Sequence, residues 1–280
     1  MINAKELRLK NFNIAVPTAF YEDESLNIAG TLAHILHLEA QGMNSFLFCG
    51  STGEQHSLSL SEKISLLDAL TDLPENPDRQ ILFGVASIRQ KEAVELAAKV
   101  SESKAVTGIL LAFSPYIRPT QEEAYRYAVA IIEAAGKSTI LYNNPLRTGF
   151  DLSVENIVQL SEHPLVEGVK DPGDDAKMAF LKAQIQKSFH YLAGGEVDML
   201  QKFSWGYNGL SSVRGNLFPK EVYAVLAAID AGNLSLAVVE DQKLQKLMEP
   251  FMTGSILVKM KKALKAQGSD VGICRTPLGN

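Results

Sequence analysis

Residues 108–142 read GILLAFSPYIRPTQEEAYRYAVAIIEAAGKSTILY, a stretch that contains one complete strand–helix–strand pattern. Short apolar runs begin and end it, at 108–111 and 139–142. Between them, TQEE at 120–123 has the sequence of a capping box, in which two side chains satisfy the free N–H groups at the start of a helix. Gly136 is a suitable stop for that helix. The stretch therefore predicts a β-strand, an α-helix and a second β-strand.

The same alternation extends along most of the chain. Each apolar run is followed by Gly, Ser, Asn, Asp or Pro and then by residues with the period of a helix. A doubly wound sheet usually has fewer strands and a nucleotide-binding turn, so eight strand candidates favour a TIM barrel. The candidates are residues 13–16, 46–49, 81–85, 108–111, 139–142, 166–170, 190–193 and 209–213.

The chain has 280 residues, a length that suits either two ordinary domains or one large barrel. Eight strand–helix units occupy it to about Val213, and Pro219 is well placed to begin a helix. Further helices are expected at 219–231, 233–248 and 255–267. We therefore predict an α/β fold, a single-domain (β/α)8 TIM barrel with a C-terminal helical extension. Residues 1–218 supply the barrel strands and helices, and residues 219–280 supply the last barrel helix and the extension.

The composition is that of an ordinary globular protein. Hydrophobic residues make up 46 % of the chain and charged residues 21 %, which excludes disorder and low complexity. The net charge of −5 argues against a nucleic acid or an anionic membrane as the partner. Residues 1–8 lack an apolar export signal, and no later stretch is apolar enough to span a bilayer. We expect a small-molecule partner, and neither nucleic acid nor membrane.

The cysteines and histidines give no sign of a metal centre. Cys49 and Cys274, the two cysteines, are far apart and form no CxxC motif, as expected for a cytoplasmic protein without structural disulfides. The five histidines form no HxH or HExxH pair of the kind that binds zinc. P-loop and GxGxxG motifs are also absent from the sequence. We therefore expect neither a metal nor another cofactor.

In a TIM barrel, reactive groups project from the C-terminal ends of the strands. The second predicted strand is followed by GSTGE at 50–54, the GSTGE loop. Its N–H groups and hydroxyls can bind a carboxylate or a phosphate. Alternatively, Ser51 or Thr52 simply caps the next helix.

The fifth and sixth predicted strands end in residues suited to carbonyl chemistry. Tyr142 can relay protons, and Arg147 can bind a carboxylate through two hydrogen bonds. Lys170 ends a strand among apolar neighbours, which favour a neutral amine that can attack a carbonyl. The alternatives are a core tyrosine, a surface arginine and a rim lysine paired with a nearby aspartate. Because all three features fall at strand ends of one predicted barrel, we expect them to form one site.

These motifs resemble those of the dihydrodipicolinate synthase and N-acetylneuraminate lyase family of pyruvate-dependent class I aldolases, from end to end of the chain. The resemblance implies that Lys170 forms a Schiff base with a 2-oxo acid, usually pyruvate, and that Tyr142 shuttles the protons. It also implies that Ser51 and Thr52 hold the carboxylate, with Ser51 joining the relay. Besides the GSTGE loop, the markers are YNNP at 142–145, RTG at 147–149, GVK at 168–170 and GYNGLSSV at 206–213.

The family markers do not agree on the second substrate, the acceptor aldehyde that reacts with pyruvate. Arg147 resembles the arginine that binds the acceptor's carboxylate in synthase-type members, which favours condensation of pyruvate with aspartate semialdehyde, whereas Ser51 is more usual in lyases. Tyr116 stands alone where synthases have two adjacent tyrosines, and is a candidate for the substrate site near a subunit contact. Ser211 stands where members of the family commonly have an apolar residue, so we expect a more polar substrate side of the pocket. Gly194, after the seventh predicted strand, is the remaining candidate for substrate binding.

Three other interpretations stay open. An aldolase for a sugar acid, such as a 2-keto-3-deoxy acid or a sialic-acid-like substrate, would use Ser211 and Glu196 to bind hydroxyl groups. A barrel that binds a metabolite without turnover belongs to a different functional class. A phosphate-dependent barrel using Gly194, Gly195 and Gly206 is less well supported, because glycines have many structural uses. The resemblance also implies assembly as a homodimer or homotetramer.

Overall fold

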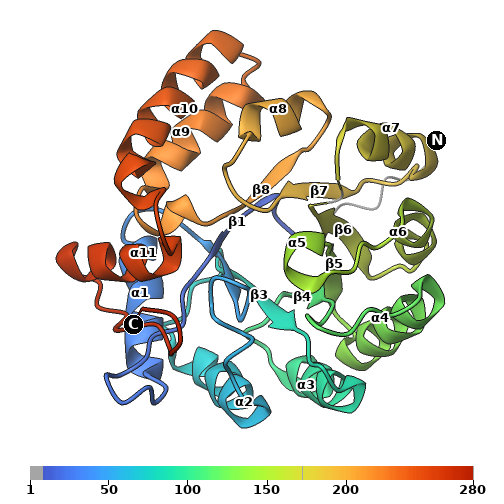
Figure 1. Ribbon diagram of the computed structural model, residues 1–280, viewed down its shortest axis with the longest axis horizontal. Coiled ribbons are helices and arrows are strands. Elements are labelled where there is room, and N and C mark those ends of the chain that lie inside the picture. The colour runs from blue at the N-terminus through green and yellow to red at the C-terminus, as the bar shows by residue number, and fades with distance from the viewer. Residues whose placement is uncertain (1–8, 172, 280) are drawn as a thin grey trace.

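A computed structural model describes residues 9–171 and 173–279. In this part of the chain, eight parallel strands close into a barrel in the order β1 to β8, with helices around the outside (Figure 1). This confirms the predicted (β/α)8 fold, and every predicted strand matches an observed one to within one residue at either end. The strands are β1 (Phe12–Ala15), β2 (Ser45–Phe48), β3 (Gln80–Val85), β4 (Gly108–Ala112), β5 (Ser138–Tyr142), β6 (Val166–Lys170), β7 (His190–Ala193) and β8 (Gly209–Ser212).

The helices between the strands are of uneven length. Among the described residues, no helix is long and apolar enough to cross a membrane. The charged start of the chain, residues 1–8, on which the expected absence of an export signal rests, lies outside the described residues. The helices up to β8 are α1 (Ile28–Glu39), α2 (Leu60–Ala69), α3 (Gln90–Glu102), α4 (Gln121–Ala135), α5 (Pro145–Thr148), α6 (Val154–Ser161), α7 (Asp175–Gln184), α8 (Met199–Ser204) and the 3-10 helix η1 (Leu70–Asp72).

Three longer helices follow the barrel strands, as predicted. Pro219 begins the first of them. The last helix and the segment after it lie beside α1 (Figure 1), where Ser269 is hydrogen-bonded to His34. The assignment of residues 219–280 to the same domain as the barrel stays a prediction. The helices after β8 are η2 (Arg214–Asn216), α9 (Pro219–Asp230), α10 (Leu234–Met248), η3 (Glu249–Phe251) and α11 (Ile256–Ala266).

The helix boundaries follow local sequence signals. The Thr120 hydroxyl accepts a hydrogen bond from the Glu123 N–H, the Glu123 carboxylate accepts one from the Thr120 N–H, and Gly136 ends α4 in the left-handed conformation. The predicted capping box and the predicted helix stop at Gly136 are therefore confirmed. Helix α2 begins with a second capping box, formed by Ser59 and Glu62. The alternative in which Ser51 or Thr52 caps this helix is therefore wrong.

Side chains fill the barrel, because successive residues of a strand point to opposite faces. The outer faces of the strands pack against the helices, with Phe46 and Phe83 fully buried there. Inside the barrel, the inward-facing side chains form a separate apolar layer. The polar groups at the strand ends lie next to this layer. Its buried members are Leu9, Ala15, Leu47, Leu82, Leu110, Ile140, Tyr142 and Leu192.

Strained backbone is concentrated at one end of this barrel. Six of the described non-glycine residues have a left-handed conformation, and all six lie in loops that follow the C-terminal end of a strand. Such conformations cost free energy and cluster at functional sites. The C-terminal end of the barrel is therefore where a site is expected. The residues are Glu24, Cys49, Glu54, Tyr116, Asp171 and Asp198.

Candidate active site

Lys170 and Tyr142 are directly paired at the ends of β6 and β5. Lys170 is only 5 % exposed, and its Nζ lies 4.6 Å from the centre of the Tyr142 ring. It forms no ion pair with any carboxylate among the described residues. Asp171, the nearest candidate partner in sequence, instead lies 3.7 Å from Lys202 Nζ. The alternative of a rim lysine paired with an aspartate is therefore wrong.

The Lys170 amino group bonds to a short chain of neutral side chains. Lys170 Nζ donates to Ser211 Oγ at 3.1 Å, and Ser211 Oγ donates to Asn13 Oδ1 at 2.8 Å. Ser211 and Asn13 are paired where β8 meets β1 and closes the barrel. The Asn13 amide nitrogen is buried and has no hydrogen-bond partner among the described residues. Asn13 was not predicted as a site residue, although an amide in an otherwise apolar strand was a possible signal.

A cavity of about 340 Å³ opens at this end of the barrel. Its volume lies in the range of small-molecule sites. Three of the predicted site residues, Ser51, Tyr142 and Arg147, contribute to its wall, so the structure brings the ends of β2 and β5 together as expected. The lining residues are Ser51, Gln55, His56, Ala112, Phe113, Pro115, Tyr142, Asn144, Arg147 and Thr148.

Asn144 arranges one side of this cavity. Its Nδ2 donates to Tyr142 Oη at 2.7 Å, while its side-chain oxygen accepts from the Arg147 N–H and caps the short helix α5. Arg147 is thereby held on α5 at the cavity wall. Its guanidinium is exposed and has no hydrogen bond or ion pair with the described residues, so it is free to bind a carboxylate. Asn144 is a functional candidate that the sequence did not identify.

The other predicted residues lie further from the cavity. Thr52 is half-buried and is not among the lining residues, and no hydrogen bond joins Ser51 to Tyr142. Tyr116 is 93 % exposed on the loop after β4. The Gly194 N–H donates to Asp171 Oδ1 at 2.7 Å, and a Cβ there would lie 1.8 Å from Asp171 Oδ2, so a side chain at position 194 would displace the Asp171 carboxylate. Roles of these residues in substrate binding stay predictions.

Glu196 does not lie beside Ser211. It is buried, and its Oε1 accepts hydrogen bonds from the Ser212 hydroxyl and, at 3.2 Å, from the Arg214 N–H. Burial raises the pKa of the Glu196 carboxyl, and the hydrogen bonds and Arg214 oppose that shift. Because Ser211 and Ser212 point to opposite faces of β8, Glu196 is on the outer face of the strand. The expectation that Ser211 and Glu196 together bind sugar hydroxyls is therefore wrong.

The remaining reactive groups do not point to competing chemistry. Burial raises the pKa of the Cys49 thiol to about 12 and that of the Cys274 thiol to about 11, which disfavours the reactive thiolate. Within residues 9–171 and 173–279, no group of three or more His, Cys, Asp or Glu side chains has a geometry that could hold a metal ion.

Known proteins resemble this chain over nearly its whole length. The dihydrodipicolinate synthetase family model matches residues 8–280. A 4-hydroxy-tetrahydrodipicolinate synthase of Streptomyces coelicolor is 30 % identical over 265 residues, which cover 94 % of this chain and 87 % of that protein. The solved 4-hydroxy-tetrahydrodipicolinate synthase of Methylacidiphilum fumariolicum is 27 % identical, with a TM-score of 0.88, covering 97 % and 90 % of the two chains. A dihydrodipicolinate synthase structure from Bacillus anthracis is 26 % identical, with a TM-score of 0.88, covering 96 % and 91 %.

Proposed function

Because the chain belongs to the dihydrodipicolinate synthetase family of class I aldolase-type lyases, we propose that it condenses pyruvate with aspartate semialdehyde through a Schiff base on Lys170. The observation that carries the proposal is the pairing of Lys170 with Tyr142 at adjacent strand ends, beside a cavity that Tyr142 lines. A buried amine without a carboxylate partner and a tyrosine at the neighbouring strand end supply the nucleophile and the proton relay that imine formation requires.

The chemistry begins when the Lys170 amine attacks the carbonyl carbon of pyruvate. Tyr142 passes a proton from the attacking nitrogen to the carbonyl oxygen, which gives a carbinolamine. A second proton, taken up from solvent, then lets this oxygen leave as water and gives the protonated imine. The protonated imine draws electrons from the neighbouring methyl group, which loses a proton to form an enamine. The enamine carbon then bonds to the aldehyde carbon, and the aldehyde oxygen takes up a proton. Hydrolysis of the imine returns the Lys170 amine and releases a 4-hydroxy-2-oxo acid.

The two carboxylates of the substrates are assigned to two parts of the cavity. We assign the pyruvate carboxylate to the N–H groups and hydroxyls of Ser51 and Thr52, and the acceptor carboxylate to Arg147. The unpartnered Arg147 guanidinium supports an acidic acceptor. We do not adopt the sugar-acid alternative, because Glu196 is already bonded to Ser212 and Arg214.

Borohydride trapping tests the Schiff base. Reduction in the presence of pyruvate is expected to attach the three-carbon acid to Lys170, as detected by peptide mass spectrometry, and Lys170→Ala is expected to stay unlabelled. Lys99→Ala, at an exposed lysine of α3, is the control and is expected to be labelled like the wild type. Absence of an adduct with every 2-oxo acid tried would favour a barrel that binds a metabolite without turnover.

Arg147 provides the test of the acceptor. Loss of a two-bond arginine–carboxylate contact in Arg147→Ala is expected to raise the KM for aspartate semialdehyde about 10- to 100-fold and to leave the KM for pyruvate unchanged. Steady-state kinetics with each substrate varied in turn measures both values. Equal effects on the two KM values would contradict the assignment of Arg147 to the acceptor.

We also propose that the protein forms a homodimer or homotetramer in the cytoplasm. The exposed apolar side chains of Ile88, Tyr116 and Ile117 near the cavity support a subunit contact at this end of the barrel. The unpaired, buried Cys49 and Cys274 support a reducing compartment. Light scattering of the purified protein measures the assembly, and a monomer at all concentrations would exclude it.

A further inference from the structure

The GSTGE loop is strained at both ends. Ser51 and Thr52 lie between Cys49, with φ of 51°, and Glu54, with φ of 52°. Non-glycine residues adopt this left-handed conformation only where surrounding contacts hold them. Strand β3 packs closely on Cys49, because a Cβ at Gly84 would lie 2.1 Å from the Cys49 carbonyl oxygen. At Glu54, the backbone forms turn hydrogen bonds with Ser51 and Ser57, and the side chain is held by contacts from outside the loop.

The C-terminal segment supplies those contacts. Glu54 is fully buried, with its Oε1 2.7 Å from Lys261 Nζ of α11 and its Oε2 accepting from the Arg275 N–H at 3.0 Å. Lys261 Nζ also donates to the carbonyl oxygens of Thr18, at 2.7 Å, and Ile273, at 2.6 Å. A buried carboxylate is stable only when it is paired and hydrogen-bonded. The conformation of Glu54 therefore depends on residues more than two hundred positions later in the chain.

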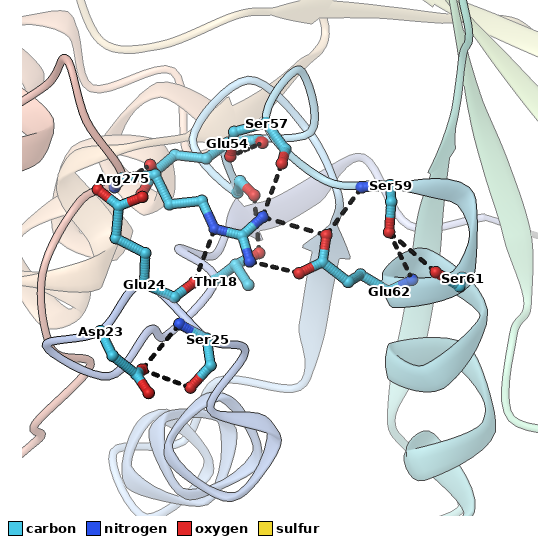
Figure 2. A network of polar contacts seen from close by, with 11 residues as sticks. Thr18, Asp23, Glu24, Ser25, Glu54, Ser57, Ser59, Ser61, Glu62 and Arg275 are labelled. Carbon is cyan, nitrogen blue, oxygen red and sulfur yellow. Dashed lines mark hydrogen bonds and ion pairs between the residues drawn. The ribbon is translucent and has the colours of Figure 1, made fainter.

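Arg275 joins the same loop to two other elements, as Figure 2 shows. Its Nε donates to the Glu24 carbonyl at 2.9 Å, and its Nη1 donates to the Ser57 carbonyl at 2.6 Å. Two further bonds, from Nη1 and Nη2, go to the Glu62 carboxylate at the start of α2. The guanidinium also lies over the Phe20 ring, 4.3 Å from its centre. One side chain thus fixes the loops after β1 and β2 relative to each other.

We propose that Glu54, Lys261 and Arg275, the C-terminal clamp, are positioning residues that set the Ser51–Thr52 backbone for the carboxylate of the 2-oxo acid. None of the three clamp residues lines the cavity, so they act through the loop. A rotation of the backbone at Glu54 moves the N–H groups and hydroxyls just before it. This inference rests on the proposed function, which assigns the 2-oxo acid carboxylate to that loop.

The chain offers a matched control at the other end of the barrel. Arg79, just before β3, bonds the Glu39 carboxylate at 2.7 and 2.8 Å and the Pro74 carbonyl at 2.7 Å. The Arg79 side chain is 9 % exposed and that of Arg275 14 %, and each binds one carboxylate twice; Arg79 also binds one backbone carbonyl and Arg275 two. Arg79→Gln and Arg275→Gln therefore remove similar side-chain interactions. Only the second loosens the segment that follows the GSTGE loop, through the lost bond to the Ser57 carbonyl, and it displaces the backbone whose N–H binds Glu54.

Kinetics is the first measurement. Arg275→Gln is expected to raise the KM for pyruvate on the order of tenfold, because misplaced binding groups weaken a contact that depends on geometry. The KM for the aldehyde and the kcat at saturating pyruvate are expected to stay at wild-type values. Glu54→Gln, which keeps the side-chain shape, is expected to act in the same direction. A purely structural role would reduce the amount of folded enzyme and leave both KM values unchanged, as expected for Arg79→Gln.

Hydrogen exchange is the second measurement and needs no substrate. Peptides covering residues 49–57 are expected to exchange faster in Arg275→Gln and Glu54→Gln than in the wild type and in Arg79→Gln. The clamp is refuted if exchange in this segment is unchanged, or if the wild type traps pyruvate and both clamp variants keep its KM. It is also refuted if Arg79→Gln raises that KM equally. If the wild type traps no 2-oxo acid, the proposed function fails. Hydrogen exchange of residues 49–57 then tests separately whether the C-terminal clamp holds the loop.

Discussion

Two lysines, Lys170 and Lys261, are buried in similar surroundings but bonded very differently. They are 5 % and 1 % exposed, and each Nζ lies over an aromatic ring, 4.6 Å from the centre of Tyr142 and 4.7 Å from that of Phe20. Lys261 Nζ contacts one carboxylate and two backbone carbonyls. Lys170 Nζ has one hydrogen bond, to the hydroxyl of Ser211.

The difference separates a structural cation from a reactive amine. Burial lowers the pKa of Lys261, and Glu54 opposes that shift. The Glu54 carboxylate and two backbone carbonyls bond the Lys261 amino group where it joins two parts of the chain. Lys170 lacks such a partner among the described residues, and its Nζ lies over the ring of Tyr142, which lines the cavity. Removing a buried lysine that is paired with a carboxylate strands a buried charge and destabilises the fold, whereas a sparsely bonded lysine is available for chemistry.

The largest expected effect separates activity from stability at Lys170. Lys170→Met is expected to lower kcat on the order of 10⁴-fold or more, because it removes the nucleophile. The free energy of unfolding should change by only about 1 kcal/mol, because the lysine has a single neutral hydrogen-bond partner. Enzyme assays and urea unfolding of the same preparation measure the two quantities. A large loss of stability would mean that Lys170 is a structural cation like Lys261.

The second prediction concerns Lys261. Lys261→Met leaves the Glu54 carboxylate buried without its cation, and is expected to reduce the free energy of unfolding by about 3–5 kcal/mol. The double variant Glu54→Gln, Lys261→Met removes both charges and is expected to recover most of that loss. Urea unfolding measures each variant, with Lys99→Met, at an exposed ion pair, as the control. A loss in Lys261→Met no larger than in Lys99→Met would contradict the interpretation.

A third buried basic side chain, His34, extends the comparison because it is neutral. Its Nδ1 lies 2.8 Å from Ser269 Oγ and its Nε2 lies 3.0 Å from Asn216 Oδ1. Burial lowers the pKa of His34 from 6.5 to about 4. Below pH 6.5 the unfolded chain therefore binds a proton that the folded protein does not, and stability falls until about pH 4. The loss attributable to His34 is expected to reach about 3 kcal/mol.

Thermal unfolding between pH 7 and pH 4 tests this prediction. His34→Gln is expected to be less stable than the wild type at pH 7 and to lose less stability on acidification, because no buried imidazole is left to protonate. His37→Gln, one turn along the same helix, is the control and is expected to keep most of the acid loss, because the buried His34 imidazole remains. An identical acid dependence in all three proteins would exclude His34 as its source.

Local sequence signals predicted most of the fold. The eight strands, the capping box of α4, the stop at Gly136 and the start of α9 at Pro219 each depend on residues close together in the chain. The pairing of Tyr142 with Lys170 was also accessible, because consecutive strands of such a barrel are neighbours and both residues end a strand. Neutral partners such as Asn13 and Asn144 were missed, because one amide in a strand or a loop carries no periodic signal.

The sequence by itself thus determined the barrel, the end at which a site forms and the pair Tyr142 and Lys170, since periodicity and strand order suffice for these. Only the tertiary structure decided which side chains complete the site. Asn13 meets Ser211 because the barrel closes between its first and last strands, and Glu196 is separated from Ser211 because adjacent residues of β8 face opposite sides. Glu54 meets Lys261 because the C-terminal helices fold back onto the barrel. Contacts between residues so far apart follow from the packing of whole elements, which no local pattern encodes.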